Sequence, residues 1–238
     1  MTGDAWNVAL NIIASVITGS AVWLATRALA WRRVRRMQVF FGLTGGDECL
    51  VVVPRHASSN RGSSVHRNDA AALLELSTVL GDCRARPEVV FHDDVYQGAA
   101  DKAEFCIGGP DANQRTAAHL RSAVPNLRHA LHEDDPEGLA ISVGEHRFPV
   151  EKGRAEYVAL AKIQRDRDDK PAFLICGQTS VSNRAAARYL QRNRARLMRN
   201  HGLRKRFCLI LRVVEPDVYG PSVVELAHDA TSEAFTAS

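Results

Sequence analysis

The sequence predicts an α/β protein in which one N-terminal transmembrane helix precedes a layered α/β domain with a mixed sheet. Three observations lead to this prediction. A long run without charge precedes a cluster of arginines, short apolar runs alternate with helical patterns from residue 50 onward, and turn residues separate them. With 238 residues, 45% of them hydrophobic and 24% charged, the chain has the composition of an ordinary globular protein.

The segment from Trp6 to Thr26 contains no charged residue and predicts a helix that crosses a membrane. At about 1.5 Å per residue this run covers roughly 30 Å, the thickness of a bilayer core. Five arginines follow it: Arg27, Arg32, Arg33, Arg35 and Arg36. Because positive charge stays on the cytoplasmic side, we expect an anchor over residues 1–36 in the cell membrane. Its N-terminus would lie outside and the main domain would be cytoplasmic.

Two further readings of this segment concern cleavage and self-association. Residues 28–30 resemble a signal-peptidase site, but no lysine or arginine precedes the apolar run, which favours an uncleaved anchor. A helix would also carry a polar face formed by Asn7, Asn11, Ser15 and Thr18. Polar side chains in lipid prefer a partner, so this face could mediate a homo-oligomer, or lipid could simply tolerate it.

The positive charge of the chain belongs to its N-terminal segment. Residues 1–36 hold five arginines and one aspartate, a balance of +4, which equals the net charge of the whole chain. The remaining residues are therefore neutral in sum. Bulk electrostatics gives no reason to expect nucleic acid as a partner, whereas the anchor implies the lipid bilayer.

The cysteines agree with a cytosolic domain. There are five, an odd number, and none forms a CxxC pair. Cys106, Cys176 and Cys208 lie inside apolar runs, where a free thiol behaves as a small buried hydrophobe in a reducing compartment. The nine histidines are scattered along the sequence, so we expect no metal site.

After the anchor we expect a connector over residues 37–47, an α/β domain over 48–230 and a tail over 231–238. Within the domain, short apolar runs predict strands, and helical periodicity bounded by capping residues and glycine or proline predicts helices. The predicted strands cover 50–53, 88–91, 105–107, 157–164, 172–176, 207–214 and 223–226, with a hairpin over 139–150 that turns at Gly144. The predicted helices cover 69–80, with Asn68 or Asp69 as N-cap, 116–123 and 183–198.

Two segments of the domain share one pattern. FCIGGPDANQR at 105–115 and LICGQTSVSNR at 174–184 each pass from an apolar strand through glycine and a polar loop into a helix that opens with asparagine and arginine. Both loops would lie at the carboxyl edge of one sheet, where open α/β folds bind ligands. The alternative is that these residues only form turns and cap helices.

Glycine, helix N-termini and arginine together suit an anion. The pattern therefore predicts a nucleotide-like ligand between two lips, with a nucleotide as the expected cofactor or signal. The lips consist of Gly108, Gly109, Asn113 and Arg115 on one side and Gly177, Gln178, Thr179, Asn183 and Arg184 on the other.

The strand–GGP loop of residues 105–120, together with the order of anchor and α/β domain, resembles membrane-tethered, Rossmann-like nucleotide-sensing or nucleotide-processing proteins of bacterial conflict systems. The resemblance implies a Rossmann-like domain that senses or processes a nucleotide. Between these two activities, a sensor or scaffold is favoured because the sequence shows no standard catalytic signature.

Three other features leave alternatives open. His92, Asp93 and Asp94 follow a predicted strand and could act as catalytic groups of a nucleotide-processing enzyme, as could the acidic stretch 132–135. Every charged residue from Arg184 to Arg206 is basic, and that helix could expose a solvated face, contact anionic lipid or hold RNA. A third reading is a ligand-free interaction module on a membrane tether.

Overall fold

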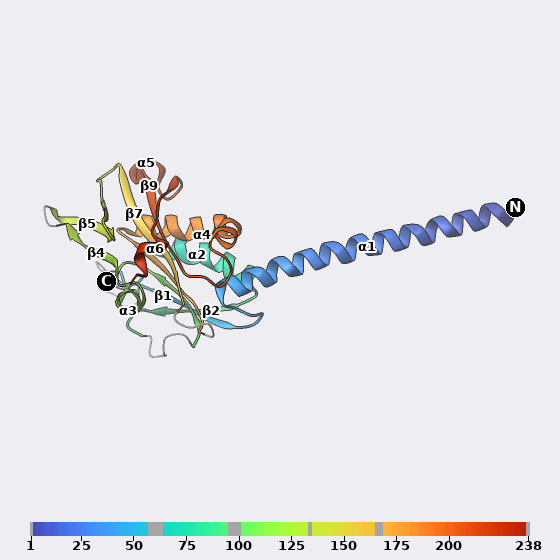
Figure 1. The fold of residues 1–238 in the computed structure, drawn as a ribbon, viewed down its shortest axis with the longest axis horizontal. Coiled ribbons are helices and arrows are strands. Elements are labelled where there is room, and N and C mark those ends of the chain that lie inside the picture. The colour runs from blue at the N-terminus through green and yellow to red at the C-terminus, as the bar shows by residue number, and fades with distance from the viewer. Residues whose placement is uncertain (1, 57–63, 95–100, 133–134, 165–168, 237–238) are drawn as a thin grey trace.

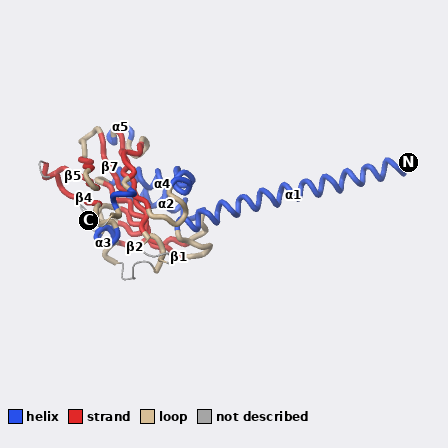
Figure 2. The backbone as a smooth tube through the Cα atoms, viewed as in Figure 1, coloured by secondary structure: helices blue, strands red, loops and turns tan. Residues whose placement is uncertain are grey.

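In the computed structural model of the protein, residues 2–56, 64–94, 101–132, 135–164 and 169–236 are described. A single long helix, α1 (Thr2–Phe41), projects from a rounded α/β body (Figure 1). Figure 2 shows the strands gathered inside the body, with helices around them. The predicted mixed α/β fold is confirmed.

The central sheet has seven strands in the order β10-β9-β7-β8-β3-β1-β2. Strands β2, β1, β3 and β8 are parallel to one another, and β7, β9 and β10 continue the sheet in antiparallel pairs. The strands are β1 (Glu48–Val53), β2 (Arg86–Phe91), β3 (Ala103–Ile107), β7 (Ala155–Ile163), β8 (Ala172–Gly177), β9 (Phe207–Val214) and β10 (Val224–Asp229).

Both faces of the inner strands are covered, which explains why β1, β3, β8 and β9 read as nearly continuous apolar runs. In β1, Cys49, Val51 and Val53 pack into one hydrophobic core, and Leu50 and Val52 pack into a second core on the opposite face. The first core lies under the end of α1, α2 (Arg67–Asp82) and α4 (Ser180–Asn200). The second lies under α3 (Gln114–Ala123), α6 (Thr231–Ala234) and a smaller sheet, and α5 (Pro216–Tyr219) is a short helix after β9.

The smaller sheet consists of β4 (Leu127–His132), β5 (Asp135–Val143) and β6 (His146–Pro149) in that order. The predicted hairpin is β5–β6, and Gly144 at its turn has a φ of 56°, which favours glycine. Strand β4 is not among the predicted elements. Its sequence LRHALH is short and half polar, so its pattern is weak.

The folded body begins inside α1. Met37, Phe40, Phe41 and Leu43 are buried in the first core, although they fall in the predicted connector. The ring of Phe41 lies 5.1 Å from that of Phe173, centroid to centroid. The predicted tail likewise contains α6, whose Ala234 is fully buried. Both segments therefore belong to the packed unit.

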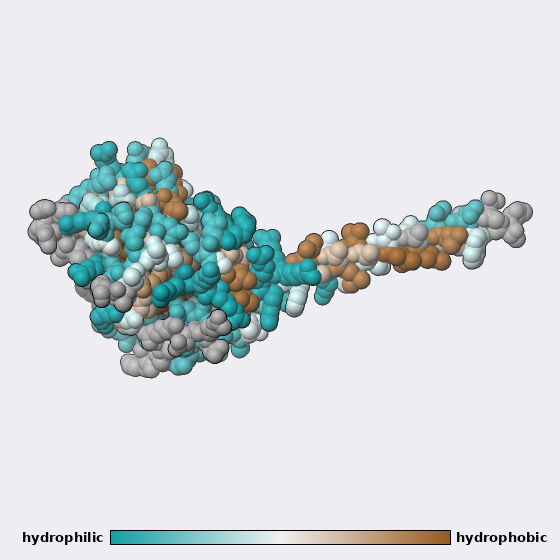
Figure 3. All heavy atoms as spheres, in the orientation of Figure 1, coloured by the Kyte–Doolittle hydropathy of each residue, from teal (hydrophilic) through white to brown (hydrophobic). Residues whose placement is uncertain are grey.

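The rest of α1 extends away from the body. Its described large apolar side chains between Trp6 and Trp31 are exposed, and Figure 3 shows apolar patches along the projecting helix next to polar residues at its base. Within the described part of the chain, no helix combines the length and the apolar character that a membrane span needs.

Candidate functional site

The structure brings the two glycine-containing loops together. Strands β3 and β8 are parallel neighbours, so both loops leave the sheet at its carboxyl edge. The amide of Gly108 donates to the carbonyl of Ile175, and Gly108 has a φ of 103° that favours glycine. At Gly177 a Cβ would lie 2.5 Å from Ser182 Oγ, so only glycine fits there. The two loops form one continuous rim.

Three helix N-termini meet at this rim. The helices α2, α3 and α4 follow β1, β3 and β8, and their first turns therefore lie above the carboxyl ends of parallel strands. Asn68 Nδ2 at the start of α2 lies 3.3 Å from Ser180 Oγ at the start of α4. The N-cap of α2 is His66 instead of the predicted Asn68 or Asp69. Converging N-termini create positive potential at this edge.

The two asparagines of the predicted lips are buried and bind backbone. Asn113 caps α3 and donates from Nδ2 to the carbonyls of Val52 and Ile107. Asn183 accepts from the amide of Gly177 at 2.9 Å and donates to Asp69, whose carboxyl pKa is raised by burial. Both side chains thus fix the shape of the loops.

Gln178 and Thr179 are engaged in the same way. Gln178 accepts from the amide of Tyr157 and donates to the carbonyls of Leu139 and Phe148, which ties the smaller sheet to the rim. Thr179 is the N-cap of α4 and donates to the carboxylate of Glu156. Asn113 and Thr179 therefore cap helices, as in the helix-capping alternative, whereas Asn183 and Gln178 bind neighbouring loops and strands.

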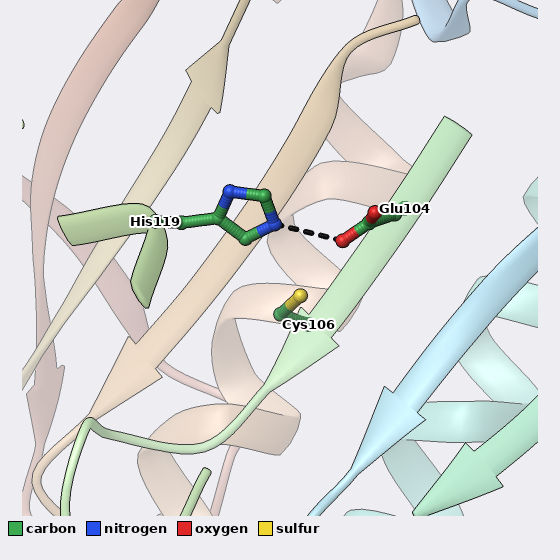
Figure 4. A group of neighbouring side chains, drawn as sticks. All are labelled: Glu104, Cys106 and His119. Carbon is green, nitrogen blue, oxygen red and sulfur yellow. Dashed lines mark hydrogen bonds and ion pairs between the residues drawn. The ribbon is translucent and has the colours of Figure 1, made fainter. Parts of the chain in front are cut away.

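The two arginines have different surroundings. Arg115 Nε lies 2.9 Å from Glu104 Oε2, and His119 Nε2 lies 2.7 Å from the same oxygen. Figure 4 shows His119 facing Glu104 with Cys106 beside them. Arg184 is half-buried, and its Nε is a buried atom without a hydrogen-bond partner in the described chain. Of these two described arginines, Arg184 is the one with a buried N–H that has no partner.

Glu104, Cys106 and His119 place their ligand atoms within 4.8 Å of one another. Both oxygens of Glu104 already accept hydrogen bonds from Arg115 and His119. Burial opposes the charge of Glu104, but these bonds outweigh it and lower its pKa to about 2. Because a guanidinium already neutralises this carboxylate, we interpret the group as a structural ion pair beneath the rim.

Sequence reasoning missed His129 of β4, which lies between the two loops. Its Nε2 is 3.3 Å from the carbonyl oxygen of Gly177, and a Cβ on Gly109 would lie 3.0 Å from its ring. The side chain is 3% exposed, and Nδ1 has no hydrogen-bond partner among the described residues, with Asp111 Oδ2 at 3.8 Å. Burial lowers the pKa of His129. The only sequence signal for this residue is its position: Leu127, His129 and Leu131 occupy every second position, which is the spacing of one face of a strand.

Two of the three candidate catalytic residues after β2, Asp93 and Asp94, form ion pairs with Arg55. Arg55 Nε lies 2.7 Å from Asp93 and its Nη2 lies 2.9 Å from Asp94. The hydrogen bond from Arg55 lowers the pKa of Asp93, and His92 Nδ1 accepts weakly from the amide of Gln114. In the second acidic stretch, residues 133 and 134 lie outside the described residues.

A separate groove of about 450 Å³ runs between α4 and β10. Arg188, Arg192 and Arg196 line it at helical spacing, with Ser222 and Glu225 opposite. Arg188 donates to Ser222 Oγ at 3.3 Å, and within the described chain none of the three arginines forms an ion pair. The basic face of α4 therefore forms one wall of a groove that carries several arginines.

No family model, curated protein or solved structure matches this chain. Function must then be argued from the site itself. The described residues offer a rim with converging helix N-termini, an unpartnered imidazole nitrogen and an arginine with a free donor. Such a rim can bind a polar anion, and the carboxylates of Glu104, Asp93 and Asp94 are held in ion pairs with arginines.

Proposed function

We propose that the protein is a single-pass membrane protein whose cytosolic, Rossmann-like α/β domain binds a nucleotide-like anionic ligand, as a sensor or scaffold. The ligand would lie on the rim above β3 and β8. One observation carries the proposal: the two glycine bends flank His129, whose buried Nδ1 lacks a partner among the described residues. A buried polar nitrogen without a partner is rare in a folded protein, and a ligand atom at the rim would satisfy this one.

The chemistry of the rim suits phosphate and a sugar or base. Helix N-termini favour negative charge, and glycine lets the backbone approach a phosphate closely. His129 can donate or accept at Nδ1, and Arg184 Nε can donate. Because the lip asparagines, Gln178 and Thr179 hold the loops in place, they would position the rim instead of contacting the ligand.

A sensor or scaffold fits this site better than an enzyme. A general base needs a titratable group within reach of the ligand, and Asp93 and Asp94 are held by Arg55. Among the described residues at the rim, His129 is a candidate for proton transfer, while the carboxyls of Asp69 and Glu156 accept hydrogen bonds from Asn183 and Thr179. The Nδ1 of His129 is 3.8 Å from Asp111, beyond the usual hydrogen-bond distance.

The proposed anchor is α1, with its N-terminus outside the cell and the α/β domain in the cytoplasm. The support is the charge-free run from Trp6 to Thr26, the exposed apolar side chains along the projecting helix, and the five arginines at its base. α1 enters the body beside Gly42 and Pro171, next to the amino ends of the parallel strands. The rim lies at the opposite edge and would face the cytosol, away from the lipid.

Thermal denaturation of the full-length protein in detergent, with a panel of nucleotides and inorganic phosphate, tests the ligand proposal. We expect at least one nucleotide to raise Tm in a concentration-dependent way. Gly109→Ala should reduce the shift because its Cβ crowds His129, whereas Gly81→Ala, which meets nothing within 4 Å, should retain it. The absence of a shift with every member of the panel would contradict the proposal.

Alkaline carbonate extraction of cell membranes tests the anchor. A spanning helix resists extraction and is released only by detergent, so the full chain should remain in the pellet. A chain lacking residues 1–31 should move to the supernatant. Release of the full chain by carbonate, combined with a dimer or larger oligomer in solution, would instead assign the apolar face of α1 to self-association.

A second candidate is an interaction module, favoured by the groove between α4 and β10. Its three arginines without ion pairs in the described chain would suit an acidic segment of a partner protein. Replacement of Arg192 and Arg196 by glutamine should abolish that interaction and leave nucleotide binding unchanged. The two candidates therefore predict separable losses.

A further inference from the structure

Three metal-ligating side chains from separate elements converge on the surface of the second core. They are His146 of β6, His228 of β10 and Glu233 of α6. His228 Nε2 lies 2.8 Å from Glu233 Oε1, and His146 Nε2 lies 3.9 Å from Glu233 Oε2. The two imidazole rings lie 4.2 Å apart, centroid to centroid. All three ligand atoms fall within 4.8 Å of one another.

These distances suit a small divalent cation. Ligand atoms about 2.0–2.1 Å from a tetrahedral zinc ion are about 3.3 Å apart from one another. The two measured separations, 2.8 and 3.9 Å, lie on either side of that value. Two imidazoles and one carboxylate form a known zinc donor set, which leaves a fourth position for water. The side chains are 52%, 25% and 31% exposed in the order His146, His228 and Glu233, so the group opens to solvent.

The fold positions these ligands specifically. A bulge in β10 falls between Leu226 and His228 and changes the direction in which His228 points. Gly144, whose φ of 56° favours glycine, lies beside the carboxylate, and a Cβ there would be 2.8 Å from Glu233 Oε2. Asn126 Nδ2 donates to the carbonyl of Glu233 and holds α6 in place. Three elements thus bring one carboxylate to two imidazoles.

An ion pair alone explains the group poorly. The contact of His228 Nε2 with Glu233 leaves His146 Nε2 3.9 Å from the carboxylate, beyond hydrogen-bond distance, although the two rings lie 4.2 Å apart. A divalent cation would bind both imidazoles and the carboxylate at once. The ring of Phe148 lies against both imidazoles, 6.4 and 6.3 Å away between centroids, and forms an apolar wall of the kind that shields a metal site.

We propose that His146, His228 and Glu233 bind one divalent transition-metal ion of the zinc class. The ion would connect the β5–β6 hairpin, the edge strand β10 and the C-terminal helix α6. The sequence does not predict this site because 82 positions separate His146 from His228, and only the fold brings them together. The inference is independent of the nucleotide proposal, which concerns the carboxyl edge of the sheet.

Zinc and cobalt titrations of the chelator-treated full-length protein test the site. We expect one Zn²⁺ per chain with a rise in Tm, and Co²⁺ should give the visible absorption of a four-coordinate nitrogen–oxygen site. His228→Ala and Glu233→Gln should each weaken zinc affinity at least tenfold. Glu145→Gln, which removes an exposed carboxylate next to His146, should leave affinity unchanged.

Several results would overturn the inference. The first is that the wild-type protein binds no zinc. The second is that His228→Ala and Glu233→Gln both bind zinc with the affinity of the wild type. Loss of binding in Cys106→Ser, together with a thiolate-to-cobalt absorption band, would assign the ion to the buried Glu104 group instead. If His228→Ala does not fold, Glu233→Gln, which preserves the side-chain shape, decides the question alone.

Discussion

Glu104 is the most strongly constrained charge among the described residues. It is 1% exposed, lies in the middle of the sheet, and accepts from Arg115 and His119. Its carboxyl pKa, about 2, is below the ordinary value of 4.5. A carboxyl with a lowered pKa stabilises the fold above its unfolded pKa, and this contribution is lost as the pH falls from about 4.5 toward 2.

Glu104→Gln should therefore destabilise the protein by about 3–5 kcal/mol at neutral pH, because Arg115 would keep its charge without a buried counter-ion. Urea unfolding of the wild type and the variant at pH 7 and in the acid range measures the effect. The difference in unfolding free energy between the wild type and the variant should decrease as the pH falls below about 4.5. Glu145→Gln is the matched control and should change stability by less than about 0.5 kcal/mol. A difference that is independent of pH would contradict the ion-pair account.

Lys162 is a second buried charge, located where α1 enters the body. Its Nζ donates to the carbonyl of Leu203 at 2.7 Å and lies 4.6 Å from the centroid of Phe40. Burial, together with the nearby charge of Arg204, lowers its pKa to about 7 from 10.5. Between these two pH values the unfolded chain binds the proton more tightly than the fold does, so stability should rise with pH.

Lys162→Met should remove this rise. The variant keeps the length of the side chain but has no ammonium group to bury, and it leaves the carbonyl of Leu203 without its donor. Chemical unfolding at about pH 7 and at about pH 10 gives the comparison, with the wild type gaining more stability than the variant over this range. Parallel changes in the two proteins would show that Lys162 is not the group that titrates.

The residues of the rim show how far sequence reasoning reaches at this scale. Gly108 and Gly177 could be identified because a glycine at the end of a strand often marks a backbone bend that other residues rarely adopt. The roles of Asn113 and Asn183 could not, because an asparagine that caps a helix and one that binds a ligand look the same in sequence. His129 was missed because its position between two loops depends on a strand of the smaller sheet.

At the level of elements, the sequence predicts strands with long apolar runs and misses one with mixed composition. The sequence YVALAKIQ of residues 157–164 fits a helix as well as the predicted strand, and β7 pairs with both β8 and β9, so tertiary pairing decides its conformation. The apolar run of β4 is too short to stand out. The sequence predicts a connector where α1 ends, because the burial of this segment depends on contacts that are distant in sequence. The contacting rings are those of Phe105, Phe173 and Phe207.

The last turn of α1 should be essential for the stability of the body. Phe40 is fully buried and packs on Phe173 and Phe207, so Phe40→Ala should cost about 3–5 kcal/mol. Leu29→Ala in the same helix is the matched control, since Leu29 is 64% exposed and should change the unfolding free energy little. Equal effects of the two substitutions in urea unfolding would contradict the assignment of residues 37–41 to the core.

The long helix and the rim lie at opposite ends of the folded body. α1 enters near the amino ends of the parallel strands, where Lys170 Nζ donates to the carbonyl of Gly42, and the rim lies at their carboxyl ends. The arginine groove and the His146, His228 and Glu233 group occupy other surfaces. A membrane tether of this geometry would present the rim to the cytosol, and the continuous helix would hold the domain at a defined orientation.

Hydrogen–deuterium exchange of the full-length protein, with and without a saturating nucleotide from the panel, shows where on the domain the nucleotide binds. We expect slower exchange confined to amides of residues 108–113, 127–129 and 177–182, because the ligand would cover the rim around His129. Unchanged exchange at the rim, or protection located instead along residues 188–196 and 221–226, would contradict binding at the rim.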